Sequence, residues 1–247
     1  KATLLRRVTY TLTGLPPTPA EIAAFQADTS TEAYARVIDR LLASPRYGEH
    51  FARHWMDLVR YADTHGSEGD PNIPQSWRYR DYLIRAFNDN VPYDQFVREQ
   101  IAGDLLPQPR VNPAEQLNES ALGTGHFRLI EHGYQPVDTL DEQVRNVDNQ
   151  IDVVSKTFLG LTVSCARCHD HKFDAISQAD FTAFYGIFAS ARPGQVTVDS
   201  PALLDQHRDR LTELKQAIRA ELSAKWVQQA KDLPAALESI RASRATL

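Results

Sequence analysis

The sequence predicts an all-α fold: a single irregular multi-helix domain followed by a helical C-terminal extension. Apolar residues recur at intervals of three and four along several segments, which gives a helix one buried side. Capping-box signals precede several of these segments, for example Thr18-Pro19-Ala20-Glu21 and Ser177-Gln178-Ala179-Asp180. Hydrophobic residues make up 42% of the chain and charged residues 24%, which fits an ordinary globular core.

The first half of the chain reads as a succession of short helices. The Thr18 capping box opens a helix to about Ala27, and Thr29 with Glu32 repeats the signal. Ser44-Pro45 then marks a break between two predicted helices. The next helix has a stripe at Tyr47, Phe51, Trp55, Leu58 and Ala62. Two more helices are expected over Trp77–Asn88 and Tyr93–Leu105, followed by Pro- and Asn-rich turns to about Asn118.

The second half contains the longest regular pattern. Thr139-Leu140-Asp141-Glu142 reads as a capping box that opens a helix. Its stripe is Val144, Val147, Ile151, Val154, Phe158 and Leu161. From about Leu203 the charged tail has apolar residues at helical spacing, and Pro234 interrupts it, so an amphipathic helix or a helical hairpin is expected. We place the main domain at residues 1–194 and the extension, or linker to a further domain, at 195–247.

Charge and hydropathy narrow the class of partner. The net charge of −5, with no stretch dense in Lys or Arg, argues against nucleic acid as a partner. No apolar run approaches the roughly 18 residues that cross a bilayer, so no transmembrane segment is expected. The opening residues, Lys1 to Arg7, read as the start of a helix, so a mature form or an excised segment is expected.

The two cysteines carry the most specific chemistry. They lie in the run Cys165-Ala166-Arg167-Cys168-His169. Two thiols one helical turn apart can add to the two vinyl groups of a haem, while the adjacent imidazole reaches the iron. The motif therefore predicts one covalently attached haem c with His169 as an iron ligand. Because thioether attachment takes place on the export side in bacteria, a periplasmic or otherwise exported location is expected.

Three other interpretations of the cysteines stay open. A thioredoxin-like redox pair expects a βαβ pattern, and none is evident. A structural zinc site needs four ligands, so histidines would have to complete it. A disulfide between Cys165 and Cys168 would close only a small loop, with little entropic gain.

A haem iron has a second axial position, for which the chain offers several candidates. His50 and His54 lie four residues apart, beside the apolar stripe of the helix that begins near Tyr47. We favour His54 as the second ligand. Met56 is an alternative that would raise the redox potential, and another histidine or an open position also remain.

Polar residues around the motif are assigned supporting roles. His171 is too close in sequence to His169 to reach the same iron easily, so a supporting or propionate contact is expected for it and for Arg167. His65, His132 and His207 lie in polar contexts and are interpreted as surface residues.

Several longer motifs resemble a known family. They are Leu12-Thr13-Gly14-Leu15-Pro16-Pro17-Thr18, Arg53-His54-Trp55-Met56-Asp57, Arg60-Tyr61-Ala62-Asp63, Tyr79-Arg80-Asp81, Glu99-Gln100-Ile101-Ala102-Gly103-Asp104-Leu105-Leu106-Pro107, and Cys165 through Asp174. With these motifs the chain resembles the cytochrome c-like family of planctomycetes, largely catalogued as a domain of unknown function. The resemblance runs from about Leu5 to Phe188. It implies a module of a larger exported protein, with Ala175 standing where the family usually has proline.

Two functional hypotheses follow from a haem. The first is an electron-transfer module that serves a redox partner protein or an attached domain. The second is a haem enzyme with an open distal side, of peroxidase or oxidase type. A haemless interaction domain, stapled by zinc or a disulfide, is the third and weakest hypothesis.

Overall fold

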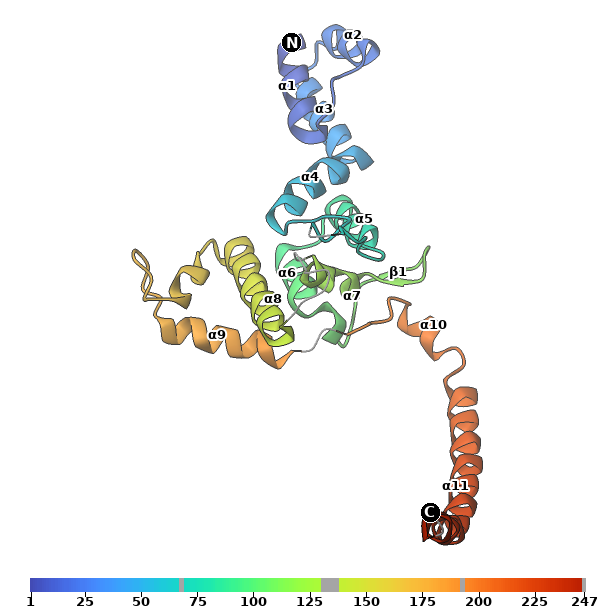
Figure 1. Cartoon of the computed structure of the whole chain (residues 1–247). Coiled ribbons are helices and arrows are strands. Elements are labelled where there is room, and N and C mark those ends of the chain that lie inside the picture. Colours follow the sequence, from blue (N-terminus) through green and yellow to red (C-terminus); the bar gives the residue numbers. More distant parts are fainter. Residues whose placement is uncertain (67–68, 130–137, 192–193, 246–247) are drawn as a thin grey trace. The chain divides into compact units, whose positions relative to one another are not determined.

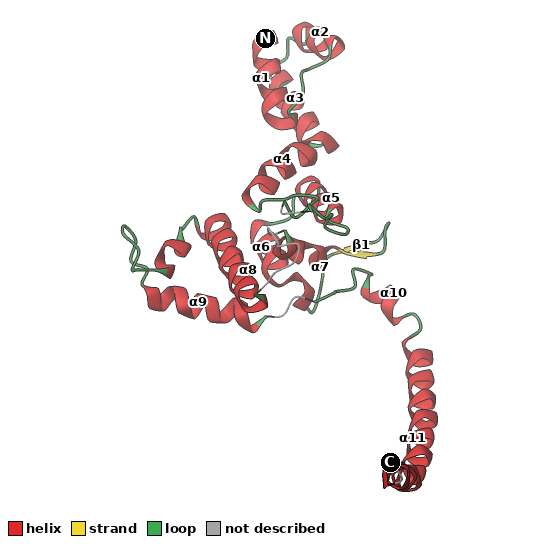
Figure 2. Ribbon diagram, in the orientation of Figure 1, coloured by secondary structure: helices red, strands yellow, loops and turns green. Residues whose placement is uncertain are grey.

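The computed structural model describes residues 1–66, 69–129, 138–191 and 194–245. Over these residues the regular secondary structure is helical apart from one short antiparallel hairpin, β1 (Val111–Asn112) with β2 (Leu117–Asn118), and an isolated bridge between Thr64 and Asn72 (Figures 1 and 2). The predicted all-α fold with a helical C-terminal extension is therefore confirmed. Among the described residues no helix is both long and apolar enough to cross a membrane.

The chain divides into two compact units, Lys1–Val198 and Asp199–Leu247. The sequence analysis placed a boundary between residues 194 and 195, and the structure divides between 198 and 199. The first unit contains three hydrophobic clusters, and α8 (Thr139–Val154) contributes side chains to two of them.

The N-terminal cluster joins α1 (Ala2–Thr13), α2 (Pro19–Ala27) and α3 (Ala33–Leu42). Its buried side chains are Leu5, Val8, Phe25, Ala33 and Leu41. The capping box predicted at Thr18 is confirmed, since the Thr18 hydroxyl accepts from the Glu21 amide and the Glu21 carboxylate accepts from the Thr18 amide. The capping box predicted at Thr29 is wrong: Glu32 itself occupies the N-cap of α3, without a side-chain hydrogen bond.

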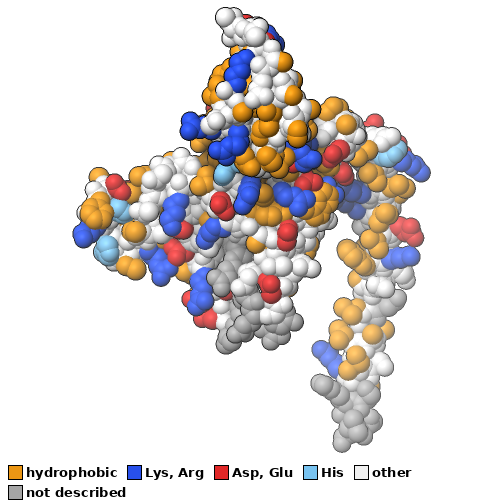
Figure 3. All heavy atoms as spheres, turned by 90° about the horizontal axis from the view of Figure 1, so that it is seen from above, with side chains coloured by type: hydrophobic (Ala, Val, Ile, Leu, Met, Phe, Trp, Pro, Cys, Tyr) orange, Lys and Arg blue, Asp and Glu red, His pale blue; other side chains and the backbone are white. Residues whose placement is uncertain are grey.

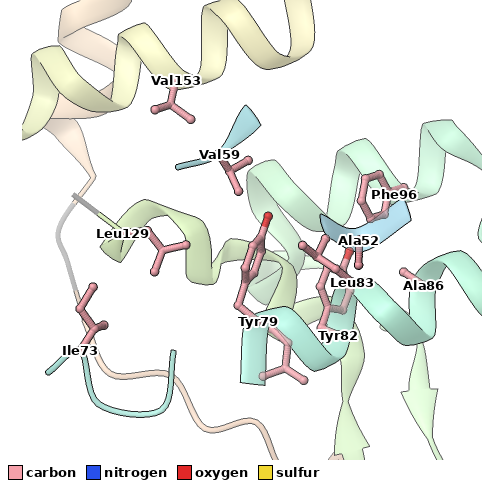
Figure 4. Packing of buried hydrophobic residues seen from close by; sticks show 11 residues of the cluster. Ala52, Val59, Ile73, Tyr79, Tyr82, Leu83, Ala86, Phe96, Leu129 and Val153 are labelled. Atoms are coloured by element: carbon pink, nitrogen blue, oxygen red, sulfur yellow. The ribbon is translucent and has the colours of Figure 1, made fainter. Parts of the chain in front are cut away.

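The central cluster packs around α5 (Figure 4). The helical elements in this region are α4 (Pro45–Leu58), α5 (Trp77–Asn88), α6 (Tyr93–Ala102), η1 (Gly103–Leu105), α7 (Glu119–Gly123) and η2 (Thr124–Arg128). Tyr79, Tyr82 and Leu83 of α5 gather with residues of neighbouring elements such as Phe96 and Val59. The helix predicted to reach Ala62 ends at Leu58, because Arg60 adopts a left-handed backbone (φ 56°) that a helix cannot contain.

A group of buried and partly buried polar side chains lies beside this cluster and is called the polar seam. It consists of Glu99, Arg110, Tyr82, Ser120, Glu119 and Arg85. Glu99 is fully buried and receives two hydrogen bonds from Arg110, both of 3.1 Å. Tyr82 and Ser120 donate further bonds to the same carboxylate, at 2.9 and 3.0 Å. Glu119, 1% exposed, pairs with Arg85 at 2.6 Å. Each buried carboxylate is thus paired with a guanidinium, which offsets the cost of taking the charge out of water.

The third cluster packs α8 (Thr139–Val154) against α9 (Gln178–Ser190), which lie side by side (Figure 1). Between them come a π-helical turn, η3 (Ser155–Leu159), and a 3₁₀ turn, η4 (Val163–Arg167). The capping box predicted at Ser177 is confirmed. The cap of α8 is Asp138 and not Thr139 as predicted: the Asp138 carboxylate accepts bonds from the first-turn amides.

The second unit consists of α10 (Pro201–Asp205) and α11 (Arg208–Ala245). α11 is one helix that continues through Pro234, so the alternative of a helical hairpin is wrong. Hydrophobic side chains show on its surface in Figure 3, and those of Leu211, Ile218 and Trp226 are exposed.

Candidate functional site

The cysteine motif lies on η4 and the turn after it, between α8 and α9. Ala166 is fully buried in the cluster shared by these two helices, which anchors the turn. Cys165 and Cys168, on either side of it, are exposed and carry free thiols. The Cys165 amide donates to the Thr162 carbonyl at 3.0 Å. The turn therefore buries the small residue of the motif and leaves both thiols open to a ligand.

The imidazole of His169 is oriented by a backbone carbonyl. Its Nδ1 lies 2.7 Å from the Asp170 carbonyl oxygen, which can only accept, so Nδ1 carries the proton and donates. Nε2 is then left with a lone pair, and no described residue donates to it. A ligating histidine typically has this arrangement, with one nitrogen held by a carbonyl and the other free for the metal.

His171 organises the loop that follows. Its side chain is 5% exposed, and Nδ1 accepts bonds from the amides of Phe173, at 3.2 Å, and Asp174, at 2.8 Å. Nε2 therefore carries the proton and donates to the Thr162 hydroxyl at 2.9 Å. Both ring nitrogens are engaged within the protein, so His171 ties the loop to the residue that precedes η4. Its predicted supporting or propionate contact stays a prediction.

Two carboxylates of α8 bind side chains of η4. Arg167 Nη1 lies 2.5 Å from Asp148 Oδ2, and the Ser164 hydroxyl donates to Asp152 Oδ1 at 2.9 Å. Asp148 raises the pKa of Arg167, and the Cys168 side chain adds to this increase. The sequence analysis named Arg167 but not its partners. Asp148 and Asp152 stand four residues apart in a predicted helix, the spacing that places both on one face.

The residues proposed for the second axial position lie on a different helix. His54 is exposed on α4, with its ring 4.8 Å from that of His50 and 6.2 Å from that of Phe51. Met56 is partly buried and packs against the central cluster. Among the described residues no contact joins either side chain to the cysteine motif, so their role as iron ligands stays a prediction.

The three histidines interpreted as surface residues have different outcomes. His65 is buried, at 6% exposed, so its interpretation as a surface residue is wrong. His207 is exposed, as expected. His132 lies outside the described residues.

The donors and surfaces at the motif suit a covalently bound haem. Two exposed thiols stand three residues apart, and the adjacent imidazole keeps one nitrogen free. Phe173 is 83% exposed in the same loop, and Lys172 lies over its ring at 5.2 Å, so the site already presents an apolar side chain and a cation. In the part of the chain that the structure describes, no three or more His, Cys, Asp or Glu side chains converge as a metal site.

Comparison with known proteins gives one match. Residues 1–193 match the family described as "PSCyt2: Protein of unknown function (DUF1549)". No curated protein and no solved structure matches the chain. The family match covers all three clusters of the first unit, from α1 through α9, and therefore the cysteine motif as well. The chain belongs to the PSCyt2 family.

Proposed function

We propose that the chain is a c-type cytochrome module that carries one covalent haem and transfers electrons to a partner protein or an attached domain. One observation carries the proposal. His169 Nδ1 donates to a backbone carbonyl, no described residue donates to Nε2, and the exposed free thiols of Cys165 and Cys168 precede this histidine in the same short segment. The free nitrogen and the thiols are the donors that thioether attachment and axial ligation require.

The residues of the motif divide the task. Cys165 and Cys168 would form the two thioether bonds, and His169 would supply the proximal ligand through Nε2. Asp170 fixes the tautomer of His169 through its carbonyl. Arg167 and His171 hold the segment to α8 and to Thr162. A bound haem iron would supply one-electron redox chemistry.

The location follows from the same proposal. Thioether attachment takes place on the export side of bacterial membranes, so the chain would act in the periplasm or beyond. The second axial ligand is left as a prediction, with His54 first and Met56 second.

The test is expression in the periplasm of a host that attaches haem. The purified chain is run on a denaturing gel, stained for haem, and its oxidised and reduced spectra are recorded. Haem that survives denaturation is the expected result. Cys165→Ala and Cys168→Ala should each remove one thioether bond and shift the reduced α-band of the pyridine haemochrome. Arg145→Ala, an exposed substitution on α8, is the control and should stain like the natural chain.

The spectra also separate the two haem hypotheses. A six-coordinate low-spin spectrum supports electron transfer, whereas a high-spin spectrum supports an enzyme with an open distal side. A colourless chain from this host would contradict the haem proposal. Zinc analysis would then test the remaining interpretation of the thiols.

A further inference from the structure

A second group of candidate ligands lies on α4, apart from the cysteine motif. His50 and His54 are one helical turn apart, their ring centroids are separated by 4.8 Å, and their planes are nearly perpendicular, at 82°. Residues at i and i+4 share one face of a helix, so both imidazoles can approach a single ion. His54 is exposed and His50 is partly exposed, which leaves the pair open to solvent.

His50 is held from behind by the end of α1. Gly14 ends that helix with a left-handed backbone (φ 69°), and a Cβ at this position would stand 2.6 Å from His50 Nδ1. The Thr11 carbonyl also acts on the ring and favours a proton on it. Nδ1 of His50 therefore lies against the end of α1. One nitrogen against the protein and one toward the ion is the usual arrangement of a ligating histidine.

Arg53 acts on His50 as a neighbouring positive charge. It places that charge close to any bound cation, so the site should bind with modest affinity.

We propose that His50 and His54 form a two-imidazole chelating site for a divalent transition-metal ion, with water completing the coordination. Imidazole suits Cu²⁺, Ni²⁺ and Zn²⁺, and the general order of affinity places Cu²⁺ above Zn²⁺. The site is separate from the cysteine motif and does not depend on the haem proposal. This role and that of second axial ligand of an iron exclude each other for His54, so with the pair occupied Met56 is the candidate for the axial position.

The experiment is a calorimetric titration of the full chain with ZnCl₂ and with CuCl₂. The Cys165→Ala/Cys168→Ala variant removes the thiols, so that metal bound there does not contribute. One ion per chain is expected, with Cu²⁺ bound more tightly than Zn²⁺. His50→Ala and His54→Ala should each weaken binding at least tenfold. His207→Ala, which changes an exposed histidine of the second unit, should leave binding unchanged.

Three results would overturn the proposal: no heat of binding from either ion, binding that persists in both histidine variants, or a visible spectrum of the haem-loaded natural chain that changes in His54→Ala. The last result would return His54 to the iron. Circular dichroism of each variant checks that α4 still folds. A chain that carries no haem but binds zinc through the histidine pair would contradict the haem proposal alone, so the two proposals fail separately.

Discussion

Glu99 and His169 are both polar residues of the first unit, but their surroundings differ. Glu99 is fully buried and accepts hydrogen bonds from Arg110, Tyr82 and Ser120. His169 is exposed, and its only described hydrogen bond goes to a backbone carbonyl. The Glu99 carboxylate is thus fully engaged by protein donors, whereas the motif leaves two free thiols and one imidazole nitrogen to which no described residue donates.

This difference separates residues that hold the fold from residues that are available for chemistry. A buried carboxylate without partners would be costly, so its partners are part of the structure. An exposed thiol or imidazole costs little to leave unpartnered, because water solvates it. Substitutions in the central cluster should therefore change stability, and substitutions at the motif should change ligand binding with little effect on stability.

The largest stability effect is expected for Glu99→Ala. The substitution leaves Arg110 without its buried partner and removes the acceptor of Tyr82, at a cost of about 3–5 kcal/mol. Urea unfolding of the full chain, followed by circular dichroism, measures the change. Glu49→Ala is the matched control, because Glu49 pairs with Arg46 at 2.6 Å on the surface and should cost less than about 1 kcal/mol. Equal losses of unfolding free energy from Glu99→Ala and Glu49→Ala would contradict the expected difference between buried and exposed ion pairs.

His126 should make stability depend on pH. It is 3% exposed, and its Nε2 donates to the Gln100 carbonyl at 3.0 Å. Burial lowers its pKa to about 4. In the unfolded chain the pKa of this histidine is near 6.5. Between about pH 4 and pH 6.5 the unfolded chain therefore binds a proton at His126 that the folded chain does not bind. The contribution of neutral His126 to the free energy of unfolding is therefore complete above about pH 6.5. It decreases by roughly 3 kcal/mol as the pH falls to about 4.

His126→Gln tests this because an amide can donate to the same carbonyl without titrating. Unfolding free energies at pH 7 and pH 4.5 should differ less in this variant than in the natural chain. The pKa of His50 is also lowered, so some dependence should remain. His207→Gln, which changes an exposed histidine, should leave the dependence as it is. If His126→Gln keeps the full difference in unfolding free energy between pH 7 and pH 4.5, His126 does not titrate as expected.

The helices themselves could be predicted from periodicity and caps. Trp77–Asn88 agrees with α5 at both ends, and Ser177 caps α9 as expected. These signals are local: a stripe of apolar residues or a hydroxyl three residues before an acid. The cysteine motif is local as well, so it could be recognised in the sequence, and the haem that it predicts stays a prediction.

The polar seam could not be predicted, because its partners meet only in the folded chain. Arg110 lies in a segment that reads as turns, yet it bonds to Glu99 on α6. The sequence analysis did not predict α7, where Glu119 and Ser120 lie, because a five-residue helix shows little periodicity. Gly103 marks the same close approach: a Cβ there would stand 1.7 Å from the Ser120 carbonyl oxygen.

A smaller, local effect is expected for His171→Ala. The substitution removes the acceptor of the Phe173 and Asp174 amides and the donor to Thr162. Each such bond contributes about 0.5–1.5 kcal/mol net. Hydrogen exchange at the Asp174 amide should become faster, while exchange in α5 should not change. Faster exchange in both regions would show that the loop and the central cluster unfold together. It would contradict the expectation that substitutions at the motif leave the central cluster stable.

The smallest effect is expected at the start of α8. Asp138→Ala removes the carboxylate that accepts from Leu140 and Asp141, at a cost of about 1 kcal/mol, whereas Thr139→Ala should cost less than about 0.5 kcal/mol. Asp148, which holds Arg167 of the motif, stands more than two turns further along, beyond the reach of fraying in the first turn. Haem staining should therefore be unchanged in Asp138→Ala even though α8 is less stable. A loss of staining would mean that the motif depends on the whole of α8 and not only on the turn where Asp148 and Asp152 hold it.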